Sequence, residues 1–224
     1  LVCVALLLAL AGFSVLRRPL PQTSGTIEVP GLQARVDVIR DAHGIPQIYA
    51  ETDADLMRAQ GYVHASERFF HATAGRLSEL FGERTLETDQ MVRTMGWRRV
   101  AEQEWGLLRT DTRAALSAYA DGVNAYLAER SPTEIAAEYS VLRLTGLASH
   151  PEPWTPIDSM AWLKAMAWDL RGNMEDEMDR VLLSLDLTDD QVAQLHPEYD
   201  ASARSPIVTG GRVVNGRFDA QAAA

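Results

Sequence analysis

The chain of 224 residues has little cysteine and little positive charge. Its single cysteine, Cys3, cannot form a disulfide within the chain, and cysteines cannot build a zinc site here. The 21 lysine and arginine residues are outnumbered by 31 aspartate and glutamate residues, which leaves a formal net charge of −10. Because nucleic-acid binding needs a basic surface, this balance argues against a nucleic-acid partner.

Internal repeats and closely spaced histidines are also missing from the sequence. Neither His43 nor His64 has a second ligand at helical i, i+4 spacing, and His71 follows His64 only after seven residues. This spacing argues against a zinc site. The hydrophobic content of 46% is ordinary for a globular protein, and the length allows one or two domains.

The N-terminal segment from Leu1 to Leu16 carries no charge and is followed by Arg17 and Arg18. A membrane span needs roughly 20 apolar residues, and the chain does not begin with methionine, so we expect the span to continue upstream. Residues 1–18 are therefore predicted to be a signal peptide or a membrane anchor, and the lack of a clear small-x-small cleavage site favours the anchor. Residues 19–28 then form a linker. An exported protein is expected, either membrane-anchored or periplasmic or extracellular.

Strand and helix signals follow the linker. Alternation over Gln33–Arg40, turn residues at 41–44 and a second apolar run over Ile45–Ala50 predict a β-hairpin. Asp53 is a candidate cap for the next helix, and Ser131–Glu134 has the spacing of a capping box. Apart from the hairpin, the pattern predicts a mostly helical fold.

The stretch from Pro151 to Leu187 is the most distinctive part of the chain. Thr155, Pro156 and Asp158 indicate a helix start, with a hydroxyl cap, a proline in the first turn and a carboxylate near the positive helix end. The helix that follows is apolar on most faces, which is typical of burial inside a large protein or under another subunit. It breaks at Gly172-Asn173, a pair suited to a left-handed cap.

Four carboxylates follow this break within five positions: Glu175, Asp176, Glu177 and Asp179. A second apolar run with helical spacing, Val181–Leu187, comes after them. A kink beside carboxylates can shape a ligand pocket or hold a hard cation such as calcium. The alternative is a joint between two helices whose acidic side chains lie in water.

Five blocks of the sequence, in this order, resemble the N-terminal part of the penicillin acylase family of N-terminal-nucleophile amidohydrolases. They are VIRDAHGIPQIYAETDADLMRAQGYVHASERFF, AGRLSELFG, YADGVNAYL, EPWTPIDSMAW and MAWDLRGN. The resemblance runs from about Gly25 to Phe218. One departure is visible, because only His71-Ala72-Thr73 stands between the first two blocks, where family members carry a longer helical linker with a basic pair.

The resemblance implies an α+β, mostly helical fold in which residues 29–195 form the α-subunit part of an αββα sandwich. This part is incomplete without its β subunit, and residues 196–224 are expected to be a tail and the start of a spacer peptide. The family precursor cuts itself into these parts, and the new N-terminal serine of the β subunit is the nucleophile with its own α-amino group as base. The Ser-Asn-Asn-Trp context of that serine does not occur in this chain.

The resemblance also implies a site at the break in the central stretch. In the family this break lines the pocket for the acyl group of the substrate, and a nearby glutamate helps to bind calcium. By position, Asn173 and Met174 match the pocket-lining turn and Glu177 matches the calcium-binding glutamate. Glu175 and Asp176 remain alternatives for the metal. The other calcium ligands, and the catalytic residues, are expected on the β subunit.

The function implied is hydrolysis of a linear carboxamide by the complete precursor. β-Lactam side chains, N-acyl homoserine lactones and acylated lipopeptides are the substrates implied by the family. The partners implied are the β subunit, an acylated small molecule and, through Leu1–Leu16, a membrane. One alternative is a non-catalytic, membrane-tethered helical interaction module derived from the same family. An independent metal-dependent hydrolase is disfavoured, because no cluster of metal ligands is apparent in the sequence.

Overall fold

A computed structural model gives the fold of the chain, and its described residues are 17–67, 76–144, 151–197, 212–214 and 217–219, with Cys3, Leu10 and residues 12–14. The predicted anchor therefore lies largely outside the described residues, and His71–Thr73 lies wholly outside them. Within the described part of the chain, no helix is both long and apolar enough to cross a membrane. The chain divides into two compact units, residues 1–169 and 170–224, and we treat each by itself.

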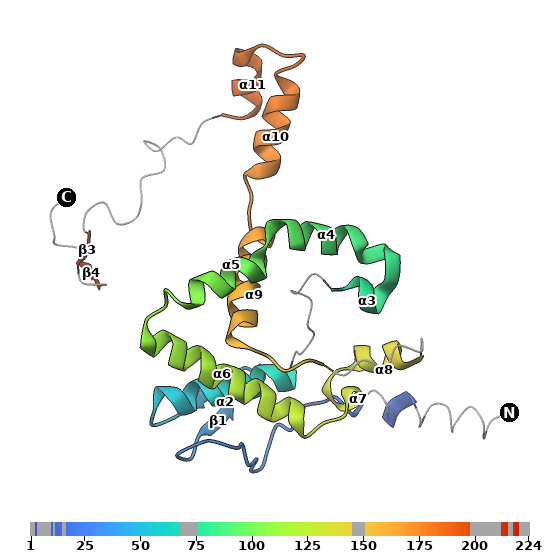
Figure 1. The fold of residues 1–224 in the computed structure, drawn as a ribbon, viewed down its shortest axis with the longest axis vertical. Coiled ribbons are helices and arrows are strands. Elements are labelled where there is room, and N and C mark those ends of the chain that lie inside the picture. Colours follow the sequence, from blue (N-terminus) through green and yellow to red (C-terminus); the bar gives the residue numbers. More distant parts are fainter. Residues whose placement is uncertain are drawn as a thin grey trace. The chain divides into compact units, whose positions relative to one another are not determined.

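The first unit contains a β-hairpin followed by helices (Figure 1). The elements in chain order are β1 (Asp37–Arg40), β2 (Pro46–Tyr49), α2 (Asp53–Glu67), α3 (Ser78–Phe81), the 3-10 helix η1 (Gly82–Thr85), α4 (Leu86–Met95), α5 (Trp97–Trp105), α6 (Thr110–Ala128), α7 (Pro132–Ile135), α8 (Ala137–Leu144) and α9 (Pro156–Asp169). The mostly helical prediction is confirmed for the described residues.

The predicted hairpin is confirmed. β1 and β2 are antiparallel, with Val38 opposite Ile48. Asp41 closes the turn, because its Oδ1 accepts hydrogen bonds from the backbone amides of His43 at 2.8 Å and Ile45 at 2.9 Å. This is the side-chain turn chemistry that aspartate favours.

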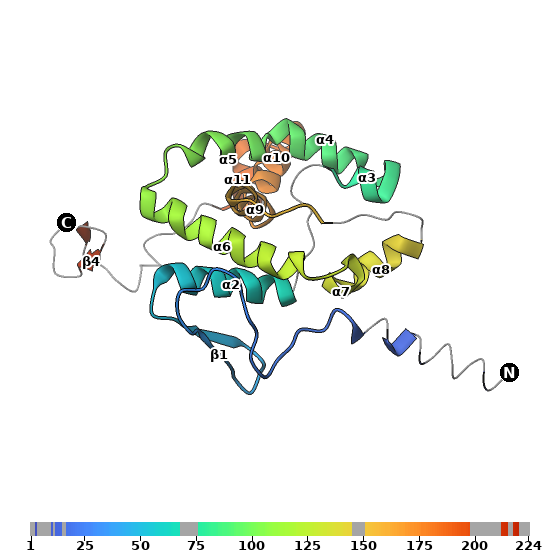
Figure 2. The same cartoon turned by 60° about the horizontal axis from the view of Figure 1, so that its bottom comes forward.

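The core of the first unit lies around the crossing of α2 and α6, which run side by side in Figure 1 and Figure 2. Gly61 on α2 faces the carbonyl oxygen of Tyr119, and Gly122 on α6 faces that of Arg58, so that a Cβ atom at either glycine would overlap with the opposite backbone. Two glycines thus allow the two helices to touch backbone to backbone. The buried side chains around this crossing are Tyr62, Ala65, Val123, Tyr126, Leu127, Ile135, Tyr139 and Leu142.

Asp55 ties the start of α2 to the segment before the hairpin. The side chain is buried, and its two oxygens accept hydrogen bonds from the backbone amides of Gln33 at 2.9 Å and Ala34 at 3.2 Å. The backbone amide of Asp55 donates to Thr52 Oγ1 at 3.1 Å. Thr52 therefore caps α2, and the predicted cap Asp53 is the first residue of the helix.

A second buried carboxylate, Asp89 of α4, fixes the start of α3. It accepts hydrogen bonds from the backbone amides of Leu77 at 2.8 Å and Ser78 at 2.7 Å, and from the Ser78 hydroxyl. Burial acts to raise the pKa of Asp89, but the hydrogen bonds from Ser78 and Leu77 outweigh it and hold the pKa below its usual value. The hydrogen bonds at the start of α3 therefore stabilise the ionised form of the Asp89 carboxylate.

The third buried carboxylate confirms the predicted start of α9. Asp158 Oδ2 accepts a hydrogen bond from the backbone amide of Thr155 at 2.8 Å, and Pro156 is the first helical residue. Asp158 Oδ1 also forms an ion pair with Arg98 Nη1 of α5 at 2.6 Å. Helix α9 packs on α5, and Met160 and Ala161 are buried there with Ala101.

The second unit contains α10 (Met174–Leu183), α11 (Asp189–Leu195) and the antiparallel strands β3 (Arg212–Val214) and β4 (Arg217–Asp219). The predicted break is confirmed, because α9 ends at Asp169 and α10 begins at Met174. The predicted left-handed cap at Gly172-Asn173 is wrong. Asn173 has φ −110° and ψ −16°, and Gly172 is not among the glycines with positive φ. The physical reason is that Asn173 starts α10 instead of ending α9.

Candidate functional site

The predicted site is the first turn of α10. Glu175, Asp176 and Glu177 occupy this turn, where the positive end of the helix dipole stabilises carboxylates. Asn173 is the N-cap residue, and its carbonyl oxygen accepts a hydrogen bond from the backbone amide of Glu177 at 2.9 Å. Asn173, Met174 and the three acids are all exposed. The structure thus brings the predicted site residues together on one exposed helical turn.

The three candidate metal ligands differ in their partners. Glu175 Oε1 accepts a hydrogen bond from Arg171 Nη2 at 2.6 Å, in an i, i+4 ion pair. Glu177 Oε1 accepts a longer hydrogen bond from Asn173 Nδ2, at 3.4 Å. Within the described residues, no further hydrogen bond or ion pair reaches the carboxylate of Glu177, and none reaches that of Asp176. Glu175 is therefore the least available of the three for a metal ion.

The chemistry of this turn fits calcium only as part of a larger site. Carboxylate oxygens suit calcium, but the ion takes six to eight oxygen ligands. Among the described residues, no three or more histidine, cysteine, aspartate or glutamate side chains are grouped so that they could hold a metal ion. Asp176 and Glu177 could supply an exposed edge of a calcium site, and the other ligands would have to come from elsewhere.

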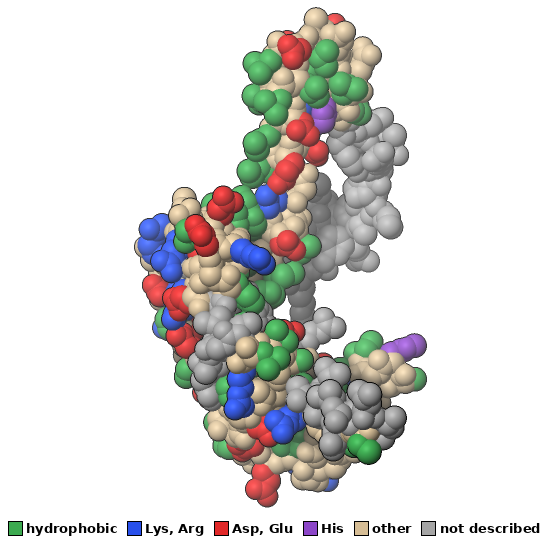
Figure 3. Space-filling model, turned by 90° about the vertical axis from the view of Figure 1, so that its right-hand side faces the viewer, with side chains coloured by type: hydrophobic (Ala, Val, Ile, Leu, Met, Phe, Trp, Pro, Cys, Tyr) green, Lys and Arg blue, Asp and Glu red, His purple; other side chains and the backbone are tan. Residues whose placement is uncertain are grey.

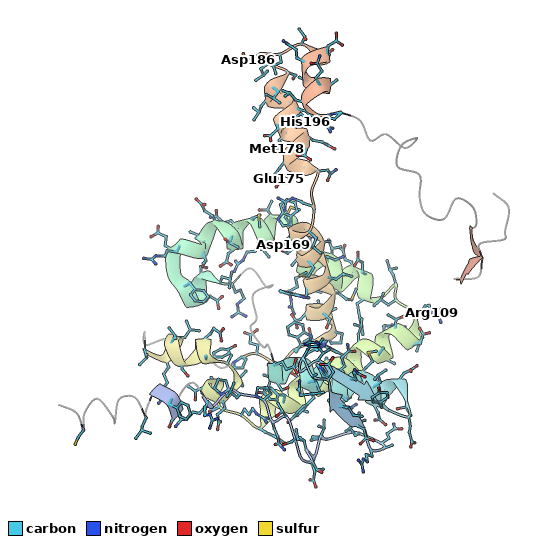
Figure 4. All side chains as sticks on the ribbon, turned by 180° about the vertical axis from the view of Figure 1, so that it is seen from behind. Arg109, Asp169, Glu175, Met178, Asp186 and His196 are labelled. Atoms are coloured by element: carbon cyan, nitrogen blue, oxygen red, sulfur yellow. The ribbon has the colours of Figure 1, made fainter. Side chains whose placement is uncertain are left out.

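A stripe of apolar side chains runs along α10 from the same turn and continues to Leu185, just after the helix ends at Leu183. Met174, Met178, Val181, Leu182 and Leu185 follow one another at helical spacing, and between 41% and 75% of each residue is exposed. Figure 4 labels Glu175 and Met178 on α10, and Figure 3 shows hydrophobic and acidic side chains together on the surface of this unit. We call these five residues the α10 stripe. Neither α10 nor α11 has a buried residue.

Sequence reasoning singled out Met174 of this stripe and missed Met178, although the i, i+4, i+7 spacing was a sufficient signal. It also missed the pairing of Arg171 with Glu175, for which the i, i+4 spacing was again visible. Both features belong to the surface that α10 presents.

Helix α9 is buried on one face only. Trp162 is 46% exposed and Leu163 is 70% exposed, although Met160 and Ala161 are buried. Among the described residues, the burial predicted from the sequence is therefore met for the face of α9 that packs on α5 and α6.

Comparison with known proteins decides the family. The family model described as penicillin amidase matches residues 35–217 of the chain. The chain belongs to the penicillin amidase family. The resemblance carried by the five sequence blocks is thereby confirmed.

Two curated relatives illustrate the range of penicillin amidase family members that this chain resembles. It is 38% identical to penicillin acylase 2 proenzyme of Pseudomonas sp. (strain SE83) over 157 residues, which are 67% of this chain and 19% of the relative. It is 32% identical to acyl-homoserine lactone acylase QuiP of Pseudomonas aeruginosa over 189 residues, which are 80% of this chain and 21% of the relative. The chain thus spans about a fifth of the length of the curated relatives that it matches.

A solved structure of the family has a similar fold. The thermostable penicillin G acylase from Alcaligenes faecalis matches with a TM-score of 0.54 and 26% sequence identity. The match covers 72% of this chain and 88% of the solved chain. The solved chain is therefore not much longer than the part of it that this protein matches.

Proposed function

We propose that this chain is the α-subunit part of an exported acylase that hydrolyses a linear carboxamide bond. The observation that carries the proposal is a contrast in coverage. The chain covers 88% of a solved penicillin G acylase chain but only about a fifth of its curated relatives. This contrast supports a protein that is made as one long precursor and works as separate chains, and the name proenzyme of one relative is in line with it.

In this proposal the reacting groups lie on the β subunit. A serine hydroxyl is a weak nucleophile until a base lies beside it, and the α-amino group of an N-terminal serine supplies such a base. Hydrogen-bond donors near the serine would stabilise the oxyanion of the tetrahedral intermediate. The present chain has no Ser-Asn-Asn-Trp sequence, so its own contribution is to binding and assembly.

Asn173 and Met174 would line the pocket for the acyl group of the substrate. Met174 suits this role, because its flexible, polarisable thioether adapts to apolar groups of different shape. Glu177, with Asp176 as the alternative, would donate a carboxylate to a structural calcium ion shared with the β subunit. The exposed positions of Met174 and Glu177 on one turn support this assignment, because both are accessible to a second chain.

The β-hairpin supports an incomplete sandwich. A two-stranded hairpin is marginally stable by itself in water, and three or more strands are needed for an independent sheet. In the hairpin of this chain, Ile39 is 57% exposed and Tyr49 is 56% exposed. We propose that strands of the β subunit extend this hairpin into one sheet of an αββα sandwich. Separately, we propose that a surface of the β subunit covers the α10 stripe.

The proposed substrate is an acylated small molecule, as the names of the penicillin and acyl-homoserine lactone acylases suggest. The proposed location is outside the cytoplasm. Its support is the uncharged segment from Leu1 to Leu16 followed by two arginines, which is typical of a signal peptide or an anchor.

The gene downstream of Ala224 provides the first test. We expect the reading frame to continue and to encode a serine in a Ser-Asn-Asn-Trp context. A stop codon soon after Ala224 would contradict the acylase proposal and favour a membrane-tethered interaction module.

The calcium assignment is tested by Glu177→Gln in the complete precursor. We expect a lower calcium content and slower maturation into two chains, because a charged ligand is lost from a site that two chains share. Elemental analysis and gel electrophoresis measure both effects. Asp179→Asn, on the same helix, and Glu175→Gln, which breaks only the pair with Arg171, are the controls and should leave calcium content unchanged. Normal calcium and normal maturation in Glu177→Gln would refute the assignment.

A further inference from the structure

Four of the seven methionines of the chain are exposed, and they form two pairs at i, i+4 spacing. The first pair is Met91 and Met95 on α4, and the second is Met174 and Met178 on α10. In the second pair, 41% of Met174 and 54% of Met178 are exposed, whereas Met160 of α9 is only 9% exposed. An oxidant must contact the thioether sulfur, so exposed methionines are the ones that it modifies. The two pairs are therefore candidate oxidation sites.

The pair on α10 begins the α10 stripe. Residues four apart lie on the same helix face, about 6 Å apart along the axis. Met174 and Met178 thus supply the first part of the apolar surface that Val181 and Leu182 continue, and Figure 4 labels Met178 on this helix. A chemical change at either sulfur therefore changes the stripe.

The surroundings of this pair are acidic. Residues 171–180 carry four carboxylates against two arginines, a net charge of −2. Because like charges repel, this charge disfavours an anionic oxidant such as hypochlorite and has no such effect on neutral hydrogen peroxide. The oxidant class that suits the α10 pair is therefore a neutral peroxide.

We propose that Met174 and Met178 form a peroxide-sensitive oxidation site, and that their oxidation prevents a second chain from covering the α10 stripe. In the reaction, the thioether sulfur attacks one oxygen of hydrogen peroxide and the O–O bond breaks. The sulfur is oxidised to a sulfoxide, and the proton of the transferred oxygen passes to the departing hydroxide, which leaves as water. The second half of this inference rests on the proposed function, in which the β subunit covers the stripe.

A sulfoxide differs from a thioether in the property on which an apolar contact depends. Its oxygen is polar and accepts hydrogen bonds, and burying it without a donor opposes association. Oxidation of Met174 and Met178 would place two such oxygens at the start of the stripe. Once a second chain covers the stripe, peroxide no longer reaches the two sulfurs. The sensitive state is therefore the chain before assembly.

Peroxide treatment of the 224-residue chain tests the first half without a β subunit. Peptide mass spectrometry over a time course measures the oxidation rate of each methionine. We expect Met174 and Met178 to be oxidised about fivefold or more faster than Met160, because burial keeps peroxide from the Met160 sulfur. Rates no higher than that of Met160 would overturn the proposal.

Substitutions in the complete precursor test the second half. Met174→Gln with Met178→Gln imitates the polar sulfoxide, and Met174→Leu with Met178→Leu keeps an apolar surface that peroxide does not oxidise. By size-exclusion chromatography, we expect the glutamine variant to have separated α and β chains or an unprocessed precursor, and the leucine variant to be assembled. The matched control is Met91→Gln with Met95→Gln, a pair of the same spacing on α4, which should assemble normally.

The outcomes separate this inference from the proposed function. Normal assembly of the α10 glutamine variant, or an equal loss of assembly in the α4 control, would overturn the inference. Failure of the unsubstituted precursor to form two chains would instead contradict the proposed function. In that case the oxidation rates in the 224-residue chain still decide whether the α10 pair is an oxidation site.

Discussion

The α2–α6 crossing and the α10–α11 unit are both helical, yet they differ in what surrounds them. At the crossing, two glycines bring the backbones together, and eight side chains around it are buried. In the second unit, neither helix has a buried residue, and four apolar side chains of α10 and the following Leu185 are exposed. The first region is completed by its own chain. The second has the amphipathic pattern of a packed helix, but the described residues supply no buried packing face for it.

This difference has a consequence for substitutions. Residue types that are critical in the first region should be replaceable in the second at little cost to the stability of this chain. Three matched pairs test the comparison, with a glycine, an aspartate and a leucine from each region.

The glycine pair should give the largest difference. Gly122→Ala places a Cβ atom against the carbonyl oxygen of Arg58, which belongs to the backbone and cannot move without displacing α2. We expect the free energy of unfolding to fall by about 3 kcal/mol or more, because overpacking is relieved only by separating the helices. Chemical denaturation followed by circular dichroism measures it.

Gly172→Ala is the control for this substitution. No atom lies within 4 Å of the position that its Cβ would take, and its φ is not positive. We expect stability to be unchanged or to rise by up to about 1 kcal/mol, because alanine restricts the unfolded chain more than glycine does. Equal losses in both variants would contradict the view that the crossing alone depends on glycine.

The aspartate pair should give an intermediate difference. Asp55→Ala leaves the backbone amides of Gln33 and Ala34 without their acceptor, and we expect a loss of about 1–3 kcal/mol. Asp179→Ala removes an exposed carboxylate of α10 and should change stability by less than about 0.5 kcal/mol. Differential scanning calorimetry of the two variants measures the contrast. A similar loss in both would mean that Asp55 does not anchor the segment before the hairpin.

Local signals in the sequence are sufficient for part of this fold. The hairpin turn at Asp41 and the start of α9 after Thr155 are correctly predicted, because each depends on residues a few positions apart. Asp55 could not be predicted in the same way, since its partners lie 21 and 22 residues away. The use of Gly122 at a helix crossing likewise depends on where α2 lies, and local propensity indicates only a weakened helix.

Helices α4 and α5 show a different limit. Each helix has a short apolar face, which is hard to recognise in the sequence among the mixed acidic and basic residues. Gly96, with φ 68°, joins the two helices in a left-handed conformation. A glycine of this kind is a common helix end, so the signal was present but weak.

For the candidate site, the sequence is enough to place Asn173 and Glu177 together on one turn. It cannot complete the calcium site, because a single turn supplies too few of the six to eight ligands that calcium takes.

In the leucine pair, Leu182→Glu should have the smallest effect on this chain and the largest on the complete protein. Leu182→Glu adds one charge to the α10 stripe, where the leucine is 60% exposed. In the 224-residue chain we expect the free energy of unfolding to change by less than about 0.5 kcal/mol, as for other exposed positions. Leu127→Glu, at a leucine that is 5% exposed beside the crossing, should cost at least about 3 kcal/mol, because it buries an unpaired carboxylate.

In the complete precursor, Leu182→Glu should have a large effect on the association of the α and β chains, although it hardly changes the stability of the isolated chain. If the β subunit covers the α10 stripe, Leu182→Glu places a charge in that interface, and desolvating an unpaired carboxylate opposes association. Size-exclusion chromatography of the mature protein should then find the α and β chains separated or the precursor unprocessed, although the isolated chain is as stable as before. A Leu182→Met variant keeps the apolar surface and should assemble normally. Normal assembly of Leu182→Glu would mean that this face of α10 stays in water, and that the apolar spacing of the stripe does not mark an interface.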